Sequence, residues 1–318
     1  MLAVFLAWIV PWGMLLTAEE FLKHRGWDLV QVETEPLEFT QPGEPGETQT
    51  LSIPVLQDDG SIGQMALEEY LTCVVLAEMP ADFEAEALKA QAVVARTYCL
   101  KRTTTGFKHE SGAVCTDSTC CQAFCLPEDY LREGGKESAL DKVRNAVQKT
   151  QGQVLTYDGA LIEATYFSCS GGMTEDAAAV WGTDIPYLQA VSSPGEEGAT
   201  HYVDTVSFSA SQFAKTIGCD RENLSIGSIT YTEGGGVNTI QIGDEEYSGT
   251  ELRQLLGLRS TAFVITNLED SVIITTKGFG HRVGMSQYGA DAMAVQGSNY
   301  TEILAHYYPG TTLELWHA

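Results

Sequence analysis

Apolar residues recur every three or four positions along three stretches of the chain, as they do on the buried face of a helix. In the first stretch these positions are Leu67, Tyr70, Leu71, Val74 and Val75, and the pattern stops at Glu78, before the helix-terminating Met79-Pro80. A longer stripe occupies Glu84 to Arg102, which contains neither glycine nor proline, and a third stretch covers Glu137 to Thr150. The pattern therefore predicts three helices.

Alternating apolar and polar positions bounded by turn residues predict strands. The segment QVLTYDGALIEATYFS turns at Asp158-Gly159, which predicts a hairpin, and residues 50–56 predict a short strand leading into a hairpin turn at residues 58–60. Residues 200–277 combine short helices near 211–217 and 249–256 with two β-like runs, SIGSITYT and VNTIQIG, on either side of three glycines. This change of character indicates an inserted subdomain.

Together these elements predict an α+β fold, with a mixed core of helices packed on antiparallel strands, a small inserted α/β-rich subdomain and an N-terminal membrane anchor. We expect an anchor or signal-like segment at residues 1–18, a linker with the first strand at 19–64, a core with a Cys/His loop at 65–199, the inserted subdomain at 200–277 and a return to the core at 278–318.

The first 18 residues, MLAVFLAWIVPWGMLLTA, contain no charged side chain. Such a run is marginally long enough to cross a bilayer, which takes about 17 to 25 residues. We expect it to anchor the chain in the cell membrane, with the remaining residues outside the cytoplasm. A cleaved signal peptide is the alternative, although no small-x-small cleavage site is as distinct as the apolar run is long.

The composition is strongly acidic, with 43 Asp and Glu against 18 Lys and Arg and a formal net charge of −25. This charge disfavours nucleic acid and anionic lipid surfaces as main partners, because both repel a polyanion. A neutral or cationic partner fits better, and a solvated acidic surface that keeps the protein soluble fits equally well.

Glu78 is the first candidate for chemistry. It lies four residues after Val74 and seven after Leu71, so its side chain shares their apolar face. Partial burial and the negative end of the helix dipole both disfavour its charge, and a carboxyl group whose pKa is raised in this way can act as a general acid near neutral pH. The alternative is a last-turn glutamate that simply extends into water.

The stretch KHESGAVCTDSTCCQAFC offers His109, Cys115, Cys120, Cys121 and Cys125 within a short loop. One histidine with closely spaced cysteines can supply the four soft ligands of a tetrahedral zinc site. We favour a structural zinc ion held by His109, Cys115, Cys120 and Cys121, because the adjacent Cys120 and Cys121 cannot easily pair with each other. Disulfides are the rival interpretation in an exported protein.

Other polar groups are weaker candidates by themselves. Lys89 and Arg96 are seven residues apart and project from one side of the second helix, where they could hold a polar ligand or Glu78. The glycine turn in YFSCSGGMT (166–174) could line a groove with backbone amides and hydroxyls. The segment GFGHRVGMSQYGA (278–290) is rich in glycine and neutral hydrogen-bonding side chains, and its lack of a following Lys-Ser/Thr excludes a nucleotide-phosphate loop.

Taken together, three segments resemble the stage II sporulation protein D family of lytic transglycosylases, whose relatives include amidase enhancers. They are EMPADFEAEALKAQAVVARTY (78–98), YFSCSGGMTEDAAAVWGTDIPYL (166–188) and GFGHRVGMSQYGADAMA (278–294) with ILAHYYPGTTL (303–313). The resemblance implies a membrane-anchored enzyme that cleaves peptidoglycan between N-acetylmuramic acid and N-acetylglucosamine during engulfment of the forespore.

The resemblance also assigns the catalytic role to Glu78. A lytic transglycosylase needs one carboxyl group, because the C6 hydroxyl of the sugar replaces water and closes a 1,6-anhydro ring. Residues in or beside the family motifs are expected to line the groove; they are Lys89, Arg96, Tyr166, Ser168, Ser170, Thr174, His281, Ser286 and Gln287. Arg282 stands where relatives commonly have a small residue, so we expect it to narrow or charge the groove.

Implied partners are peptide-stripped glycan strands, a cell-wall amidase that removes the peptides and another membrane protein of the engulfment machinery, with no nucleic acid. Two other functions compete. One is a non-catalytic glycan-binding protein that activates an amidase. The other is a hydrolase that uses a second carboxylate, for which the candidates are Glu163, Glu175, Asp176 and Asp184.

Overall fold

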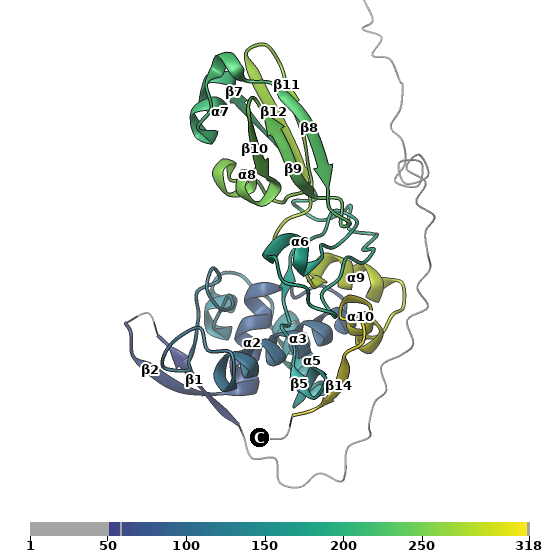
Figure 1. Cartoon of the computed structure of the whole chain (residues 1–318). Coiled ribbons are helices and arrows are strands. Elements are labelled where there is room, and N and C mark those ends of the chain that lie inside the picture. The colour runs from purple at the N-terminus through teal and green to yellow at the C-terminus, as the bar shows by residue number, and fades with distance from the viewer. Residues whose placement is uncertain (1–50, 58, 317–318) are drawn as a thin grey trace, which may run out of the picture. The chain divides into compact units, whose positions relative to one another are not determined.

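The computed structural model describes residues 51–57 and 59–316 (Figure 1). Its helices are α2 (Leu67–Glu78), α3 (Ala85–Thr104), α4 (Pro127–Arg132), α5 (Glu137–Lys149), α6 (Ala177–Trp181), α7 (Ala210–Ile217), α8 (Gly249–Leu256), α9 (Gln287–Val295) and α10 (Tyr300–Tyr307). Its strands are β1 (Ser52–Leu56), β2 (Ile62–Ala66), β3 (Val114–Cys115), β4 (Gln153–Tyr157), β5 (Ala160–Leu161), β6 (Tyr166–Phe167), β7 (Val203–Ser209), β8 (Ile226–Tyr231), β9 (Val237–Ile242), β10 (Glu245–Ser248), β11 (Phe263–Asn267), β12 (Ser271–Lys277), β13 (Met285–Ser286) and β14 (Thr312–Leu315).

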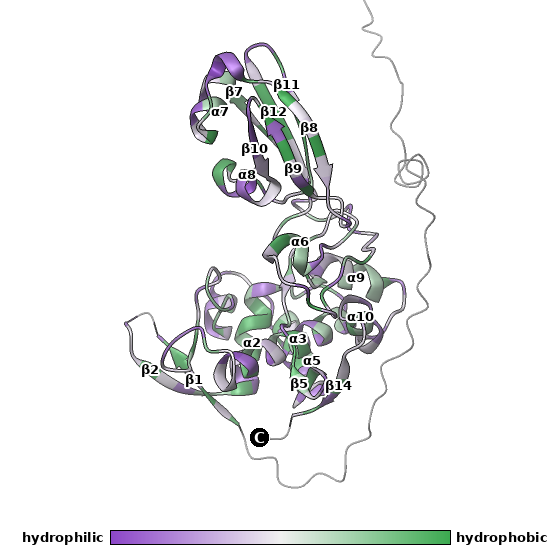
Figure 2. Ribbon diagram, viewed as in Figure 1, coloured by the Kyte–Doolittle hydropathy of each residue, from purple (hydrophilic) through white to green (hydrophobic). Residues whose placement is uncertain are grey.

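The three helices predicted from periodicity are confirmed as α2, α3 and α5. Helix α2 ends at Glu78 because Met79 leaves the helical region, with φ −130° and ψ 135°, ahead of Pro80. Hydrophobic residues cover much of α2 (Figure 2). Helix α3 is buried along most of its length and contacts α2, α5, α9, α10 and β4, so it is the centre of the main hydrophobic core.

Small sheets surround this helical centre. The predicted hairpins are confirmed: β1 pairs antiparallel with β2, and β4 pairs antiparallel with β5 on one edge and with β14 on the other. Two pairings are parallel, β1 with β3 and β6 with β13. The fold is therefore mixed α/β with several small sheets, and the expectation of purely antiparallel strands was wrong.

A second hydrophobic cluster is formed by residues between Phe213 and Ile274. Its strands form two antiparallel sheets, in the orders β11-β12-β7 and β10-β9-β8, and α7 and α8 contact each other beside them (Figure 1). The sequence predicted α7, α8, β8 and β9 but not the other four strands. The existence of a separate core agrees with a subdomain at 200–277, whose boundaries stay a prediction.

The predicted anchor at residues 1–18 lies outside the described residues. Among the helices that the structure does describe, none combines the length and the apolar character needed to cross a bilayer.

A buried carboxylate, Glu196, joins the segments around β6 and β13. It is 1% exposed, and its Oε2 accepts hydrogen bonds from the Ser170 amide (2.7 Å), the Ser170 hydroxyl (2.8 Å) and the Gly171 amide (2.9 Å). Its Oε1 accepts from the hydroxyls of Ser193 (2.6 Å) and Ser286 (2.5 Å). Charge-assisted hydrogen bonds of this kind make the burial of an ionised group tolerable.

A second buried carboxylate, Glu175, forms an ion pair with Arg282, whose Nη1 lies 3.0 Å from Glu175 Oε1. The same oxygen accepts from the Gly236 amide at 3.0 Å, and Arg282 Nη2 donates to the carbonyls of Met173 and Gly234 at 2.7 Å. These bonds connect the main core to the loop between β8 and β9.

We expect Gly289→Ala to destabilise the fold. A Cβ at Gly289 would lie 2.1 Å from the Tyr307 hydroxyl and 2.2 Å from Ser193 Oγ, beside Glu196. Alanine normally improves a helix by up to about 1 kcal/mol over glycine, but this overpacking should cost roughly 1–3 kcal/mol. Thermal unfolding measures the net change.

The matched control is Gly198→Ala, because nothing lies within 4 Å of a Cβ at Gly198. Equal melting temperatures for Gly289→Ala and the wild type would contradict the described packing around Glu196.

Candidate active site

A pocket of about 650 Å³ lies at the C-terminal end of α2. Its wall combines α2 and α3 with the Cys/His loop, the segment around β6, the end of α6 and the loop before β13. The lining residues are Glu78, Tyr98, Arg102, Lys108, Ser118, Cys120, Cys121, Glu163, Ala164, Thr165, Tyr166, Phe167, Ser168, Trp181, Ile185, Phe279, Gly280 and His281.

Glu78 lies in this pocket as the last residue of α2 and is half-buried. Burial raises the pKa of its carboxyl group, while hydrogen bonds from the Ala123 amide (2.7 Å to Oε1) and the Tyr166 hydroxyl oppose part of the rise. The net effect keeps the proton on Glu78 to a higher pH than on a solvated glutamate. The role of Glu78 as a general acid stays a prediction, for which a raised pKa is the required property.

Tyr166 is oriented by a relay of hydrogen bonds. Gln122 Nε2 donates to its hydroxyl oxygen at 3.0 Å, which leaves the hydroxyl proton free to point at Glu78. Burial raises the pKa of Tyr166 well above its usual value, and the nearby Glu78 acts in the same direction. Tyr166 is therefore a neutral donor that favours the ionised form of Glu78 once the proton has left.

Aromatic rings form another part of the wall. The His281 ring centroid lies 5.4 Å from that of Trp181 and 5.6 Å from that of Phe167. Trp181 is 44% exposed at the end of α6, where Gly182 (φ 72°) terminates the helix. An exposed indole in a polar pocket can stack on the apolar face of a sugar ring. The sequence analysis missed Trp181, for which the dipeptide Trp181-Gly182 after a helical run was the available signal.

His281 is a neutral hydrogen-bonding group. Burial lowers its pKa to about 4, and the charge of Arg253 adds to the effect. Its Nδ1 accepts a hydrogen bond from the Val283 amide at 3.1 Å, so the ring proton is on Nε2. Both ring nitrogens are thus engaged by backbone, at Val283 and at Tyr166, so the pocket is lined here by a fixed, uncharged imidazole.

The predicted metal ligands come together beside the pocket. The ligand atoms of His109, Cys115, Cys120 and Cys121 all lie within 4.8 Å of one another, and His109 Nε2 is 3.5 Å from Cys120 Sγ and 3.7 Å from Cys121 Sγ. Tetrahedral zinc with bonds of about 2.0–2.3 Å needs ligand atoms roughly 3.5–3.8 Å apart. The donor set and its spacing therefore fit zinc.

The thiols of this cluster differ in acidity. Burial opposes ionisation of Cys115, but hydrogen bonds from the Asp117 backbone and from its three cluster neighbours lower its pKa to about 7. Cys125 lies apart from the cluster, with its amide donating to the Cys73 carbonyl at 3.1 Å. All eight cysteines are within the described residues, and none forms a disulfide.

The structure places Tyr166, Ser168 and His281 in the pocket, as expected, but it corrects the other groove predictions. Lys89 pairs with Glu86 at 2.5 Å rather than with Glu78. Arg96 is fully buried and pairs with Glu68, with 2.6 Å between Nη2 and Oε2. The spacing of seven residues correctly places Lys89 and Arg96 on one side of helix α3. It does not determine which residues that side of the helix contacts, so the predicted partners were wrong.

The remaining corrections involve hydroxyl and amide groups. Ser170 and Ser286 bind the buried Glu196, and the Thr174 hydroxyl binds the backbone of residues 189 and 191. Gln287 is 6% exposed and does not line the pocket. The backbone amides of Ser170 and Gly171, expected to face a ligand, also bind Glu196.

Arg282 does not narrow or charge the groove, because it is 2% exposed and paired with Glu175. Its φ of 67° lies in the left-handed region, which disfavours most side chains. That conformation explains why a small residue suits this position, and the ion pair with Glu175 stabilises arginine in it.

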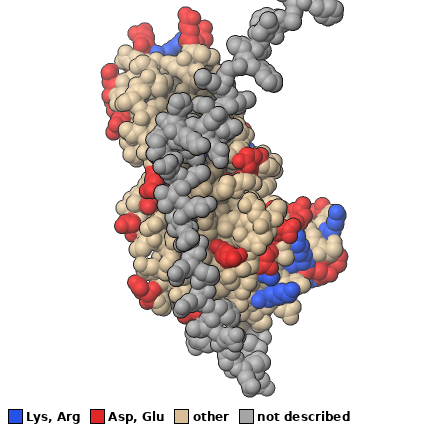
Figure 3. Space-filling model, turned by 90° about the vertical axis from the view of Figure 1, so that its right-hand side faces the viewer, with Lys and Arg blue, Asp and Glu red and all other residues tan. Residues whose placement is uncertain are grey.

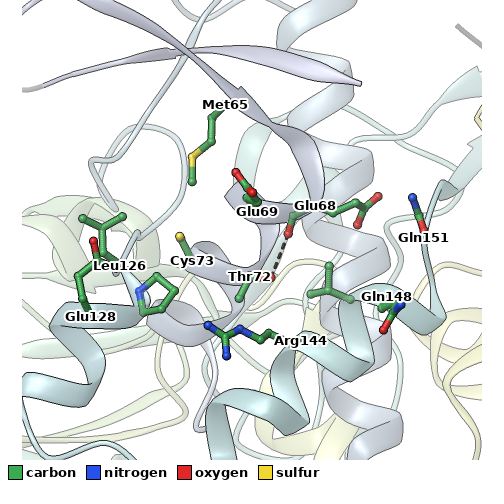
Figure 4. Close-up of a pocket in the computed structure, with 12 residues that line it drawn as sticks. Met65, Glu68, Glu69, Thr72, Cys73, Leu126, Glu128, Arg144, Gln148 and Gln151 are labelled. Carbon is green, nitrogen blue, oxygen red and sulfur yellow. Dashed lines mark hydrogen bonds between the residues drawn. The ribbon is translucent and has the colours of Figure 1, made fainter. Parts of the chain in front are cut away.

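A separate hollow of about 480 Å³ lies between α2, α4 and α5 and shares no lining residue with the first pocket (Figure 4). Some of its polar groups are engaged: the Thr72 hydroxyl donates to the Glu68 carbonyl, Glu68 pairs with Arg96, and Arg144 pairs with Glu137 and Asp141.

The chain is similar to known proteins over most of its length. A family model described as stage II sporulation protein matches residues 57–157. The chain is 40% identical over 270 residues to stage II sporulation protein D of Bacillus amyloliquefaciens, a match that covers 83% of this chain and 78% of that protein. The corresponding protein of Bacillus subtilis (strain 168) is 39% identical over 270 residues, with 83% and 79% covered.

An amidase enhancer of Bacillus subtilis (strain 168) is 32% identical over 296 residues, covering 76% of this chain and 39% of that protein. These similarities place the chain among sporulation proteins. The chain belongs to the stage II sporulation protein D family and is also related to an amidase enhancer.

His281 should make stability depend on pH. Its pKa in the folded state, about 4, lies below the ordinary value of about 6.5. Its contribution to stability is therefore complete above about pH 6.5 and is lost as the pH falls toward 4, where protonation favours the unfolded chain. In thermal melts, we expect the wild type to lose stability more steeply over this range than His281→Gln. Parallel pH profiles would contradict the burial of a neutral imidazole.

Proposed function

We propose that this protein is a lytic transglycosylase that cleaves peptide-stripped peptidoglycan between N-acetylmuramic acid and N-acetylglucosamine, with Glu78 as the acid and base. The observation that carries the proposal is a half-buried carboxyl group with a raised pKa, held by Ala123 and Tyr166 in a pocket with an exposed tryptophan. Membership of the sporulation protein D family supports it.

In the proposed reaction, protonated Glu78 gives its proton to the glycosidic oxygen as the bond from that oxygen to C1 breaks. The C6 hydroxyl of the same muramic acid residue attacks C1, and the Glu78 carboxylate takes up the hydroxyl proton as the 1,6-anhydro ring closes. Donors from Ala123 and Tyr166 stabilise the carboxylate between these two proton transfers. Glu78 ends in the state in which it began.

The other carboxylate that lines this pocket, Glu163, is engaged in two ion pairs, at 3.1 Å with Lys101 and 2.5 Å with Arg102. Both of its oxygens are therefore already engaged by cations. Of the other candidates for a second carboxylate, Glu175 is buried against Arg282 and Asp176 caps α6. These contacts favour a one-carboxylate mechanism over hydrolysis.

The proposal includes the location of the protein and its partners. A chain anchored in the cell membrane by residues 1–18, with its active site outside the cytoplasm, would meet glycan strands during engulfment. A cell-wall amidase and another membrane protein are the proposed partners. The relationship to an amidase enhancer supports the amidase, and it also favours a second candidate function, that of a glycan-binding activator that cuts nothing itself.

Substitution of Glu78 tests the catalytic role. We expect Glu78→Gln to reduce cleavage of peptide-stripped glycan by about 10³-fold, since the amide can neither give nor take the proton. Mass spectrometry of the products should show anhydro-muramic ends for the wild type, and the wild-type rate should fall as the pH rises past the raised pKa of Glu78.

Glu69→Gln is the matched control, because Glu69 lies on the same helix but lines the other hollow. Reducing ends without anhydro sugars would favour a hydrolase. Unchanged cleavage by Glu78→Gln would remove the proposal, and amidase stimulation without any cleavage by the wild type would establish the activator.

We also propose that the Cys/His cluster binds one structural zinc ion. When bound, zinc would crosslink the loop that delivers Gln122 to Tyr166 and Ala123 to Glu78. Elemental analysis of protein purified without added zinc should give about one zinc per chain. We expect His109→Ala to lose zinc and to unfold at a lower temperature, because an open site binds the metal more weakly.

Cys219→Ser should keep its zinc, since Cys219 lies outside the cluster. Protein without zinc and without reactive thiols would show disulfides instead and would overturn this assignment.

A further inference from the structure

The pocket at Glu78 carries cations in a strongly acidic protein. Acidic side chains are spread over the face drawn in Figure 3, and the fewer basic side chains lie mostly at its right-hand side, with another near the top. Arg102 and Lys108 nevertheless both line the pocket, and both lie close to Tyr98. The Arg102 guanidinium carbon lies 4.9 Å and the Lys108 ammonium nitrogen 5.6 Å from the centroid of the Tyr98 ring.

Both cations are held in place by the surrounding chain. Arg102 Nη1 donates to the Gly106 carbonyl at 3.1 Å and Nη2 to Glu163 at 2.5 Å, and the buried Nε has no partner among the described residues. The Lys108 ammonium donates to the Cys120 carbonyl, yet Lys108 is exposed and keeps donors for a ligand. Orientation by the aromatic ring and the backbone lowers the entropic cost of binding an anion.

The charges around this part of the pocket do not cancel. Lys101, Arg102 and Lys108 are cationic, and Glu163 is the anion paired with the first two. Burial raises the pKa of Glu78 and so opposes a second negative charge here. Among these groups the three cations outnumber the single carboxylate that pairs with two of them.

We propose that Arg102 and Lys108 form a subsite for the lactyl carboxylate of N-acetylmuramic acid. This inference rests on the proposed function, since it assumes that a muramic acid residue lies next to Glu78. The carboxylate is free only after the peptide has been removed. In a peptide-bearing strand the same carbon is part of a neutral amide, so the two cations would lose their ionic partner and would meet the bulk of the peptide instead.

The subsite therefore distinguishes stripped from unstripped strands by charge. A charge-assisted hydrogen bond to a partly exposed lysine or arginine should change affinity by about 10-fold, allowing for screening by solvent. Because exposed charges are screened by salt, the preference should shrink as ionic strength rises.

Binding measurements on full-length Glu78→Gln protein test the subsite without interference from cleavage. The probes are a peptide-free glycan oligomer with free lactyl carboxylates and the same oligomer with those carboxylates converted to primary amides. We expect the carboxylate form to bind about 10-fold more tightly. Lys108→Gln or Arg102→Gln, each added to Glu78→Gln, should reduce this preference to about 3-fold or less, while Arg102→Lys retains part of it.

Lys215→Gln is the matched control, because it removes the same charge from an exposed position on α7 and should keep the full preference. Lys108→Gln removes no ion pair and should leave the fold intact even if Arg102→Gln does not. Equal binding of the two oligomers, or an equal loss of affinity for both in Lys108→Gln, would overturn the proposal.

The outcomes separate this inference from the proposed function. A charge preference together with normal cleavage by Glu78→Gln would support the subsite and reject the catalytic assignment. Loss of cleavage in Glu78→Gln without a charge preference would support the catalytic assignment and reject the subsite. Failure of both oligomers to bind would reject the inference and the glycan-binding function together.

Discussion

The burial of the Glu196 carboxylate is the constraint on which the pocket wall depends. An ionised group in the interior must have donors on every side, and here the donors come from residues 170–171, 193 and 286. Losing any donor would leave part of a charge unsolvated, so the three segments are held in one arrangement. That arrangement fixes β6 against β13, and with them Tyr166 and His281 in the wall.

Glu78 depends on a different support. Glu78 is the last residue of helix α2. The Cys/His loop positions Ala123, whose amide donates to the Glu78 carboxylate, and Gln122, whose side chain donates to the Tyr166 hydroxyl. The environment of the acid is therefore provided jointly by a rigid helix and by the long loop between α3 and α4. A bound metal ion would stabilise such a loop by crosslinking its ligands, and this stabilisation does not require a hydrophobic core within the loop.

Local patterns predicted the helices and hairpins well, since α2, α3, α5 and the turn at Asp158-Gly159 are encoded by neighbouring residues. Glu78 and the metal-ligand cluster could also be found, because each is signalled within a short segment. Ser170 and Ser286 could not be assigned correctly, as their partner Glu196 is 26 and 90 residues away in sequence. A hydroxyl that faces a buried carboxylate looks the same in sequence as one that faces a sugar. Trp181, Arg102 and Lys108 were missed because only the fold brings them to Glu78.

The parallel pairing of β6 with β13 joins Tyr166–Phe167 to Met285–Ser286, and the Tyr308 hydroxyl donates to the Thr165 carbonyl at 2.6 Å. One side of the pocket is thus completed by segments that follow β6 late in the sequence. A chain that has emerged only as far as residue 280 would already contain Glu78 and α3 but would lack the wall that closes around a ligand. The order of synthesis therefore delays completion of the pocket wall until the segments around β13 and α10 have been made, well after Glu78 and α3.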